Sequence, residues 1–238
     1  MNIKSRKAFG LIGTLLVVLS LVLVNGTSQA ASLNTFRKSQ AAYKVTKSIM
    51  PYGSSRSGAV LNNKGKPEYI VVHYVGNPNT TAKGNANWFS MCNNGNVRKY
   101  QSTNGTVVYD VKSPGKGWKD IGKCAVSAHY VVGLKGEVIQ CVPDNERAVH
   151  ANTYYNQRSI GIETCHVDSK GNYTQETYTT TVRLVAALAK KYNIPQKKII
   201  RHYDVTGKNC PALFAGEKNA KWDKFLSDVN AVRTGKVK

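Results

Sequence analysis

Seven residues in the first third of the chain indicate where the folded core begins. Residues 69–75 read Y-I-V-V-H-Y-V, with apolar and mostly β-branched side chains on both alternating faces. A strand that is apolar on both faces is typical of the middle of a sheet that is covered on both sides. The one histidine of the segment, His73, falls near the carboxyl end of this predicted strand.

Further segments predict neighbouring strands. Residues 127–132 and 137–142 are strand-like and are joined by G-L-K-G, which is a hairpin pattern. Residues 158–164 read R-S-I-G-I-E-T and predict another strand. The Gly-, Asn- and Lys-rich residues 93–123 predict mostly loop, with a hairpin around residues 106–111.

Helical periodicity follows in the second half of the chain. Apolar residues recur every three or four positions over residues 174–192, with Thr174 as a plausible N-cap. Shorter patterns predict helices at residues 82–91 and at about 219–232. Because strands and helices interleave, we expect an α/β fold: a single domain with a central mixed β-sheet flanked by helices.

The amino-terminal residues 1–30 predict a secretion signal. Basic residues precede an apolar run at residues 8–24, and Ser28 and Ala30 then stand where a signal peptidase would cut. The run is about as long as the shortest membrane-spanning helices, so an uncleaved anchor is the alternative. We expect cleavage, and hence a secreted protein with no stable membrane insertion. The rest of the chain divides into a polar leader (31–48), a folded domain (49–232) and a basic tail (233–238).

The chain is strongly basic, with a formal net charge of +21. Removing residues 1–30 takes away three basic and no acidic residues, which leaves +18. Such a charge attracts anionic polymers. Nucleic acid is one candidate, but no nucleic-acid recognition motif is present, so an anionic cell envelope is the better one. Generic solubility is the plainest alternative.

A cluster of chemically reactive side chains lies in residues 201–211, which read R-H-Y-D-V-T-G-K-N-C-P. His202 and Cys210 can share a metal only if the chain loops back, and Gly207 and Pro211 are residue types that favour such a loop. Two ligands are too few for a stable zinc site, and His73 is the best candidate for a third. A His₂Cys set leaves the fourth tetrahedral position open for water, as in a catalytic zinc site.

Hydrolysis at such a site needs a base and a group that stabilises an oxyanion. Glu163 fits the base because it ends the I-G-I-E strand, and strand ends are where clefts open. Lys208 lies two residues before Cys210, so in an extended segment both side chains point the same way. Each residue also has a plain interpretation: a core histidine, a solvated lysine, an ordinary ion pair or a disulfide cysteine.

The order of four motifs resembles a known family. V-V-H-Y, S-A-H-Y-V-V, S-I-G-I-E and R-H-Y-D-V-T-G-K-N-C-P are similar to those of the type-2 N-acetylmuramoyl-L-alanine amidases. That family includes phage amidases like T7 lysozyme and catalytic peptidoglycan-recognition proteins. The resemblance runs from about Ile49 to Phe225. It implies a zinc amidase that cuts the amide between N-acetylmuramic acid and L-alanine in peptidoglycan, with its metal in a surface groove at strand ends.

The resemblance also implies roles for individual residues. Its zinc ligands fall on His73, His202 and Cys210, for one Zn²⁺ per chain. Its catalytic lysine falls on Lys208, and the glutamate that many members use as general base falls on Glu163. The folded domain of residues 49–232 would then be the catalytic domain of an autolysin or a lytic enzyme. A peptidoglycan-recognition module that binds without cutting is the alternative, although that class usually lacks the cysteine ligand.

Some positions depart from the family pattern or extend it. Where some phage members carry a tyrosine before the hairpin histidine, this chain has Ala128, so the base role stays with Glu163. His129 is a candidate for the groove wall, with core packing as an equal alternative. Asn152 is a second candidate for substrate binding. The long segment 93–123 is expected to form a groove wall.

The cysteine count is odd, at five, so a monomer would leave at least one thiol unpaired. If Cys210 holds the metal, as the resemblance implies, the other four are free to pair. The flanks of the long segment suggest Cys92 with Cys124, which leaves Cys141 with Cys165. We expect a monomer that acts on peptidoglycan, that is drawn to anionic wall polymers by its charge, and that does not bind nucleic acid.

Overall fold

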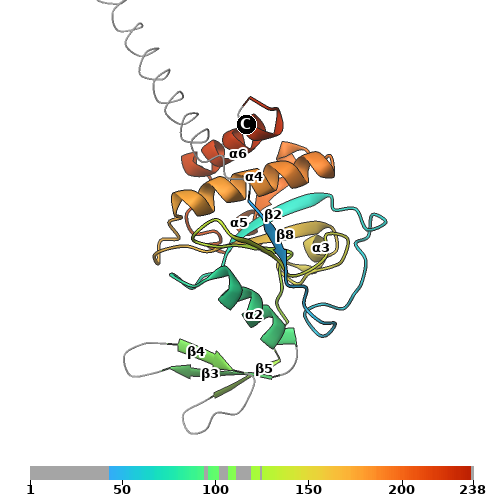
Figure 1. The fold of residues 1–238 in the computed structure, drawn as a ribbon, viewed down its shortest axis with the longest axis vertical. Helices are drawn as coiled ribbons and strands as arrows, with labels where there is room; N and C mark the ends of the chain where they lie inside the picture. The colour runs from blue at the N-terminus through green and yellow to red at the C-terminus, as the bar shows by residue number, and fades with distance from the viewer. Residues whose placement is uncertain (1–42, 94–95, 102–106, 111–118, 124, 237–238) are drawn as a thin grey trace, which may run out of the picture. The chain divides into compact units, whose positions relative to one another are not determined.

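The computed structural model describes residues 43–236 apart from short internal stretches (Figure 1). Those stretches are residues 94–95, 102–106, 111–118 and 124. The predicted signal and most of the predicted leader lie outside the described residues. Among the helices described, none is both long and apolar enough to cross a membrane.

A six-stranded mixed sheet forms the centre of the domain. The predicted central strand is β2 (Tyr69–Tyr74), and its neighbours β8 (Ser159–Thr164) and β9 (Ile199–Arg201) both pair with it in parallel. The hairpin pair is antiparallel, while the other pairs are parallel, so the predicted mixed sheet is confirmed. In spatial order the strands are β1 (Val45–Lys47), β7 (Val138–Gln140), β6 (Tyr130–Val132), β8 (Ser159–Thr164), β2 (Tyr69–Tyr74) and β9 (Ile199–Arg201).

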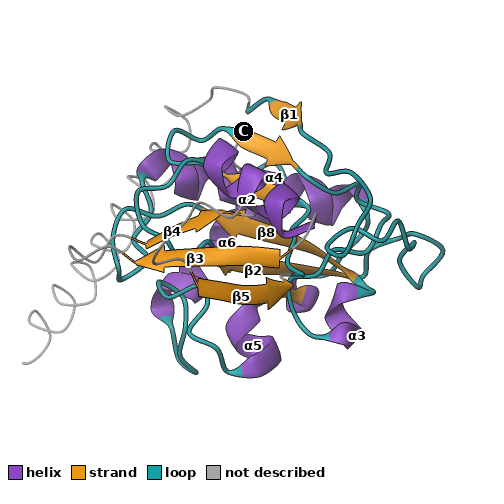
Figure 2. Cartoon of the chain, turned by 90° about the horizontal axis from the view of Figure 1, so that it is seen from below, coloured by secondary structure: helices purple, strands orange, loops and turns teal. Residues whose placement is uncertain are grey.

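Helices cover both faces of this sheet, as predicted (Figure 1). One face carries α2 (Ala82–Asn93), and the other carries α4 (Gln175–Lys191) and α6 (Ala220–Arg233). The edge strand β1 is seen at the top of Figure 2. It comes from the end of the predicted leader, so those residues contribute a strand to the sheet.

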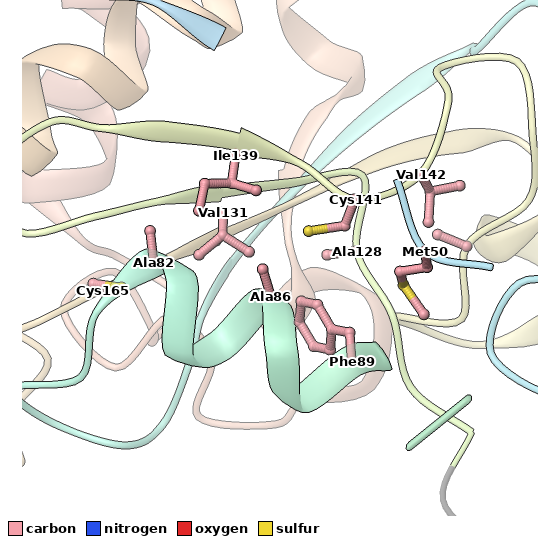
Figure 3. Packing of buried hydrophobic residues seen from close by; sticks show 11 residues of the cluster. Met50, Ala82, Ala86, Phe89, Ala128, Val131, Ile139, Cys141, Val142 and Cys165 are labelled. Atoms are coloured by element: carbon pink, nitrogen blue, oxygen red, sulfur yellow. The ribbon is translucent and has the colours of Figure 1, made fainter. Parts of the chain in front are cut away.

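The contact between α2 and the hairpin forms one of the hydrophobic clusters of the core (Figure 3). Ala82, Ala86 and Phe89 repeat at a spacing of four and three residues, which places them on one face of the helix. That face packs against Val131 of β6 and Ile139 of β7, and all five side chains are buried. This packing fixes the position of α2 beside the hairpin end of the sheet.

The first turn of α4 is attached to the hairpin turn through threonine hydroxyls. Thr174 is the N-cap, and its Oγ1 accepts a hydrogen bond of 3.0 Å from the backbone N–H of Thr177. The same hydroxyl donates to the carbonyl of Leu134 (2.7 Å), and the Thr177 hydroxyl donates to that of Gly133 (2.9 Å). The predicted cap is therefore confirmed, and it also locates the helix on the sheet.

The last helix, α6, packs on α4 through aromatic side chains. Its N-cap is Asn219, whose side chain accepts from the backbone N–H of Trp222 at 3.1 Å. Trp222 stacks on Phe225 with ring centroids 5.2 Å apart, and both are buried. The Tyr178 hydroxyl of α4 donates to the carboxylate of Asp228 at 2.7 Å. These contacts close the face of the sheet opposite α2.

The prediction of mostly loop over residues 93–123 is wrong for the described part of that segment. It forms a three-stranded antiparallel sheet in the order β4 (Val107–Asp110), β3 (Asn96–Gln101) and β5 (Lys119–Lys123). Its sequences N-V-R-K-Y-Q and K-D-I-G-K are polar and carry no apolar run. Their strand state therefore depends on pairing with each other, which a local pattern does not reveal.

The predicted bridge between Cys141 and Cys165 is also wrong, because both cysteines are free and fully buried. They belong to the cluster under α2, where Figure 3 shows the two sulfurs well apart. The prediction pairs Cys141 and Cys165 only because they remain after Cys92 is matched with Cys124, and it does not consider their positions in the fold. Cys92 is disulfide-bonded, as predicted, and its expected partner lies outside the described residues.

Candidate metal centre

Three parallel strands deliver the candidate site residues to one edge of the sheet. His73 is the fifth residue of β2, and Glu163 is the fifth residue of β8. His202 directly follows β9. Because β2, β8 and β9 run parallel, their carboxyl ends lie at the same edge. Side chains more than 120 positions apart in sequence are thus brought together by strand direction alone.

A short helix and a left-handed glycine return the chain to this edge. Helix α5 (His202–Thr206) ends at Gly207, which has φ of 74° and so takes the left-handed conformation that glycine tolerates. The chain then turns back, and the backbone N–H of Tyr203 donates to the carbonyl of Cys210 at 2.8 Å. The sequence required such a loop for His202 and Cys210 to share a metal. The structure provides it through one helical turn.

The start of α5 is held in place by a buried arginine. The backbone N–H of Arg201 donates to Asp204 Oδ2 at 2.8 Å, and its guanidinium donates to the same carboxylate. The guanidinium also donates to the carbonyl of Gly216 at 2.9 Å. The residue before His202 is therefore tied to the first turn of α5 and to the segment that follows Cys210, which orients the histidine.

The three expected ligands converge with the spacing of a tetrahedral site. Their donor atoms all lie within 4.8 Å of one another. His73 Nδ1 is 3.1 Å from His202 Nδ1 and 3.8 Å from Cys210 Sγ. Usual zinc bond lengths and tetrahedral angles place two nitrogens about 3.4 Å apart, and a nitrogen and a sulfur about 3.6 Å apart. The geometry of the donor set therefore fits zinc.

The protonation preferences of this set also fit a cation. Burial is the main cause that lowers the pKa of His73 well below its ordinary value, with further contributions from His150, His202 and Lys208. A neutral imidazole is the form that binds a metal. Burial raises the pKa of the Cys210 thiol to about 12. A thiolate at this position needs a nearby positive charge, which a bound divalent cation supplies.

Glu163 has an unsatisfied oxygen next to these ligands. Its Oε2 is buried and has no hydrogen-bond partner among the described residues. Burial raises the pKa of this carboxyl to about 8, and the charge of Lys208 acts in the opposite direction. Buried polar atoms without a partner are rare and require an explanation. A water molecule or a substrate group beside the metal would provide the missing partner.

The site lies on the wall of a cavity of about 640 Å³. The wall includes all five residues predicted to carry metal or catalysis, and Lys208 is the exposed one of the five, in the turn beside Cys210. Trp88 and Phe89 of α2 line the same cavity, where Phe89 is buried and Trp88 is half-buried. The volume is within the range of pockets that hold small-molecule groups.

The two candidate substrate-binding residues lie elsewhere. His129 is fully buried, its Nδ1 accepts from the backbone N–H of Gly161 (3.0 Å), and its Nε2 donates to the carbonyl of Glu146 (2.9 Å). This placement matches the core-packing alternative. Asn152 is exposed and is the N-cap of α3 (Thr153–Asn156), accepting from the backbone N–H of Tyr155 at 3.1 Å. Neither residue belongs to the described wall of the cavity.

Sequence reasoning missed His150, which lines the cavity and contacts the candidate ligand His73 directly. Its Nδ1 lies 3.0 Å from His73 Nε2. His150 follows the hairpin in the segment A-V-H-A-N and shows no periodic relation to the other histidines. Only its residue type, a histidine just before a helix cap, could have drawn attention to it.

The fold and the donor set together define the class: an α/β domain with a candidate His₂Cys metal site at the carboxyl edge of its sheet. Solved structures share this fold. The structure of PlyL has a TM-score of 0.56 at 22% identity, covering 78% of this chain and 96% of that one. Staphylococcus aureus hydrolase AmiA, in complex with its ligand, has a TM-score of 0.57 at 16% identity, covering 87% and 93%.

The chain belongs to the N-acetylmuramoyl-L-alanine amidase family, whose model matches residues 63–213, more than half of the chain. It is 34% identical over 161 residues to N-acetylmuramoyl-L-alanine amidase CwlL of Bacillus licheniformis, covering 63% of this chain and 37% of that relative. It is 28% identical over 212 residues to amidase BlyA of Bacillus subtilis, covering 80% and 48%. The chain thus spans about a third to a half of the length of these curated relatives.

Proposed function

We propose that this protein is a zinc-dependent amidase that hydrolyses the bond between N-acetylmuramic acid and L-alanine in peptidoglycan. One observation carries the proposal: on the wall of a cavity, a His₂Cys donor set lies beside a buried glutamate oxygen that has no hydrogen-bond partner in the described part of the chain. A structural zinc site has four protein ligands and needs no base beside it. Membership of the amidase family supports this choice of bond.

The zinc ligands in this proposal are His73 Nδ1, His202 Nδ1 and Cys210 Sγ. When bound, zinc supplies a Lewis acid that polarises a carbonyl and lowers the pKa of water. The burial of His73 and Cys210, at 1% and 2% exposure, excludes bulk water from two sides of the set. His202 is only partly buried, so the set stays accessible from the cavity.

Glu163 is the general base and acid in this proposal. Its carboxylate takes a proton from the attacking water and returns it to the amine of L-alanine as the amide bond breaks. A group serves both steps best when its pKa lies near the working pH. Burial gives the Glu163 carboxyl that property by raising its pKa to about 8, and Lys208 keeps the rise from being larger.

Lys208 stabilises the negative charge that develops on the carbonyl oxygen. It lines the cavity together with the three metal-facing residues, and its charge acts on both Glu163 and Cys210. A cation beside the carbonyl lowers the energy of the developing oxyanion. In this proposal the charge of Lys208 therefore lies on the side of the scissile carbonyl that faces the cavity.

The proposal also includes secretion through the amino-terminal signal and attachment to the cell wall through the basic charge. A protein secreted after cleavage near residue 30 would reach the cell wall, and a mature charge of +18 would attract its anionic polymers. Raising the salt to about 0.3 M shortens the Debye length to well under 10 Å, so binding to isolated walls should weaken markedly. Unchanged binding would exclude charge as the means of attachment.

The decisive experiment is to incubate the purified protein with isolated peptidoglycan. We expect new L-alanine amino termini, their loss after treatment with a chelator, and their return when zinc is added. New reducing ends in place of amino termini would indicate a glycosidase. Cleavage that persists after complete metal removal would contradict the zinc proposal, while binding without any cleavage would support a recognition module.

A further inference from the structure

His150 occupies a position directly behind the candidate ligand His73. Its Nδ1 lies 3.0 Å from His73 Nε2, and the two rings meet edge to face at 89° with centroids 5.0 Å apart. We propose that His150 is a positioning residue, which accepts a hydrogen bond from His73 and so orients that imidazole toward the metal. This inference rests on the proposed zinc site.

The position of the other ligands assigns the proton on His73. Its Nδ1 faces His202 Nδ1 at 3.1 Å and Cys210 Sγ at 3.8 Å, so Nδ1 is the atom that binds the metal. A ring nitrogen that binds a metal carries no proton, and the neutral ring then carries its proton on the other nitrogen. His73 Nε2–H is therefore a donor, and it needs an acceptor inside the protein.

His150 Nδ1 supplies that acceptor, and the other ring nitrogen of His150 continues the chain of hydrogen bonds. With Nδ1 accepting from His73, its own proton is on Nε2, which lies 3.2 Å from the hydroxyl oxygen of Ser159. The Ser159 hydroxyl in turn donates to the backbone carbonyl of Tyr155 at 2.6 Å. A carbonyl accepts only, so the chain has one consistent direction from the metal to the backbone. Such outer partners fix both the tautomer and the orientation of a metal-bound histidine.

The neighbouring strand leaves room for this ring. A Cβ atom at Gly161, in the middle of β8, would lie only 2.6 Å from His150 Cγ, which is too close for any side chain. The backbone of His150 is also held in place, because Asn156 Oδ1 accepts from the N–H groups of His150 (3.0 Å) and Ala151 (2.7 Å). Glycine in a strand interior weakens the strand and often marks a close approach. Here the approaching group is the His150 ring.

The test compares two substitutions that separate the acceptor from the volume. His150→Phe keeps a ring of similar size and removes the acceptor, whereas His150→Asn places Oδ1 near the position of Nδ1 and loses most of the ring. The measurement is the zinc dissociation constant of each variant, determined by competition with a chelating indicator. We expect about a 10- to 100-fold weaker zinc affinity for His150→Phe and a value close to that of the unaltered protein for His150→Asn.

A role in packing alone predicts the opposite order, with His150→Phe unchanged and His150→Asn impaired, and that result would overturn the inference. His166→Phe is the matched control. It replaces a buried histidine outside the cavity wall, whose Nδ1 donates to the carbonyl of Asp168 and whose ring packs on Tyr74. Its zinc affinity should not change. Circular dichroism of the metal-free variants identifies any that fail to fold.

A second readout examines the tautomer directly. In the zinc-loaded, ¹⁵N-labelled protein, His150 should be unprotonated at Nδ1 and protonated at Nε2 in long-range ¹H–¹⁵N spectra. The reverse tautomer would leave His73 without an acceptor and would overturn the inference. If the unaltered protein does not bind zinc at all, the proposed function fails instead, so the two failures are distinguishable.

Discussion

Glu163 on β8 lies directly opposite His73 on β2 in the parallel register of the central sheet. Residues paired side by side in neighbouring parallel strands point to the same face of the sheet. The candidate base and a candidate metal ligand are thus neighbours because of strand pairing and not because of any flexible loop. A site built on strands holds its geometry more precisely than a site built on loops.

Glu163→Gln should remove hydrolysis while leaving zinc bound. The amide keeps the size of the carboxyl but cannot accept and return a proton, so activity on peptidoglycan should fall by about 10²- to 10⁴-fold. Zinc content is measured by elemental analysis, and activity by release of L-alanine amino termini. Glu176→Gln, at the exposed first turn of α4, is the matched control. Loss of zinc from Glu163→Gln would mean that the carboxylate is itself a ligand.

Lys208→Met should lower kcat with little effect on zinc content. The substitution keeps most of the side-chain length and removes the charge that is proposed to face the oxyanion, and losing one such group lowers kcat by about 10²- to 10³-fold. Steady-state kinetics on a soluble muropeptide measures the effect. Lys197→Met, an exposed position before β9, controls for the loss of one positive charge. A change in KM alone would assign Lys208 to substrate binding.

Three cysteines should react with a thiol reagent in the unfolded protein without prior reduction. Among the described residues Cys141, Cys165 and Cys210 carry free thiols, while Cys92 is disulfide-bonded and Cys124 is its expected partner. Mass spectrometry after alkylation in denaturant should therefore show three additions, and five after reduction. A single addition before reduction would restore the bridge between Cys141 and Cys165. In the folded protein those two should react slowly, because burial raises the pKa of each thiol to about 12.

Asp144→Asn should destabilise the protein through the junction between the hairpin and α4. The Asp144 carboxylate accepts from the hydroxyls of Tyr130 (2.5 Å) and Tyr192 (2.7 Å), and from Lys191 Nζ (3.0 Å). Hydrogen bonds to a buried charge contribute about 1.5–3 kcal/mol each before desolvation is subtracted. We expect a net loss of about 2–3 kcal/mol at neutral pH, measured by chemical denaturation. Tyr192→Phe removes one donor and should lose about 1 kcal/mol.

The effect of Asp144 has a defined pH dependence. Burial alone would raise the pKa of this carboxyl, but the hydrogen bonds from Tyr130, Tyr192 and Lys191 outweigh it, so the pKa lies below the ordinary value of 3.8. A group with a lowered pKa stabilises the fold above its unfolded-state pKa and loses this contribution as the pH falls through its folded-state pKa. The difference in the free energy of unfolding between the unaltered protein and Asp144→Asn should therefore be largest near pH 7 and should shrink toward pH 2. A constant difference would indicate a packing effect.

The long regular elements were predictable because their patterns repeat within the segment itself. The apolar run that became β2 and the threonine-capped periodicity of α4 both match their predicted ranges closely. The residue types that zinc and hydrolysis require were also readable, since few residues bind zinc or carry protons. For this reason His73 and Glu163 could be selected from residue type and strand position, and His202 from its closeness to Cys210 in the sequence.

Short elements and contacts between distant residues were not predictable in the same way. Strand β9 has three residues and exists as a strand because β2 pairs with it. His150 lies 77 positions from His73, and no spacing rule joins them. The cysteine count was compatible with a second bridge, but the orientation of Cys141 and Cys165 in the core decided against it.

The sequence by itself determined the kinds of atoms available: two histidines, a cysteine, a glutamate and a lysine, each placed at a strand end or in one short turn. It also determined the alternation of apolar strands and amphipathic helices that bury the sheet. Only the tertiary structure decided which atoms face one another. Parallel pairing brings Glu163 beside His73, and the missing side chain of Gly161 lets His150 reach the same ligand. Distances between residues far apart in the chain follow from packing, which no local pattern encodes.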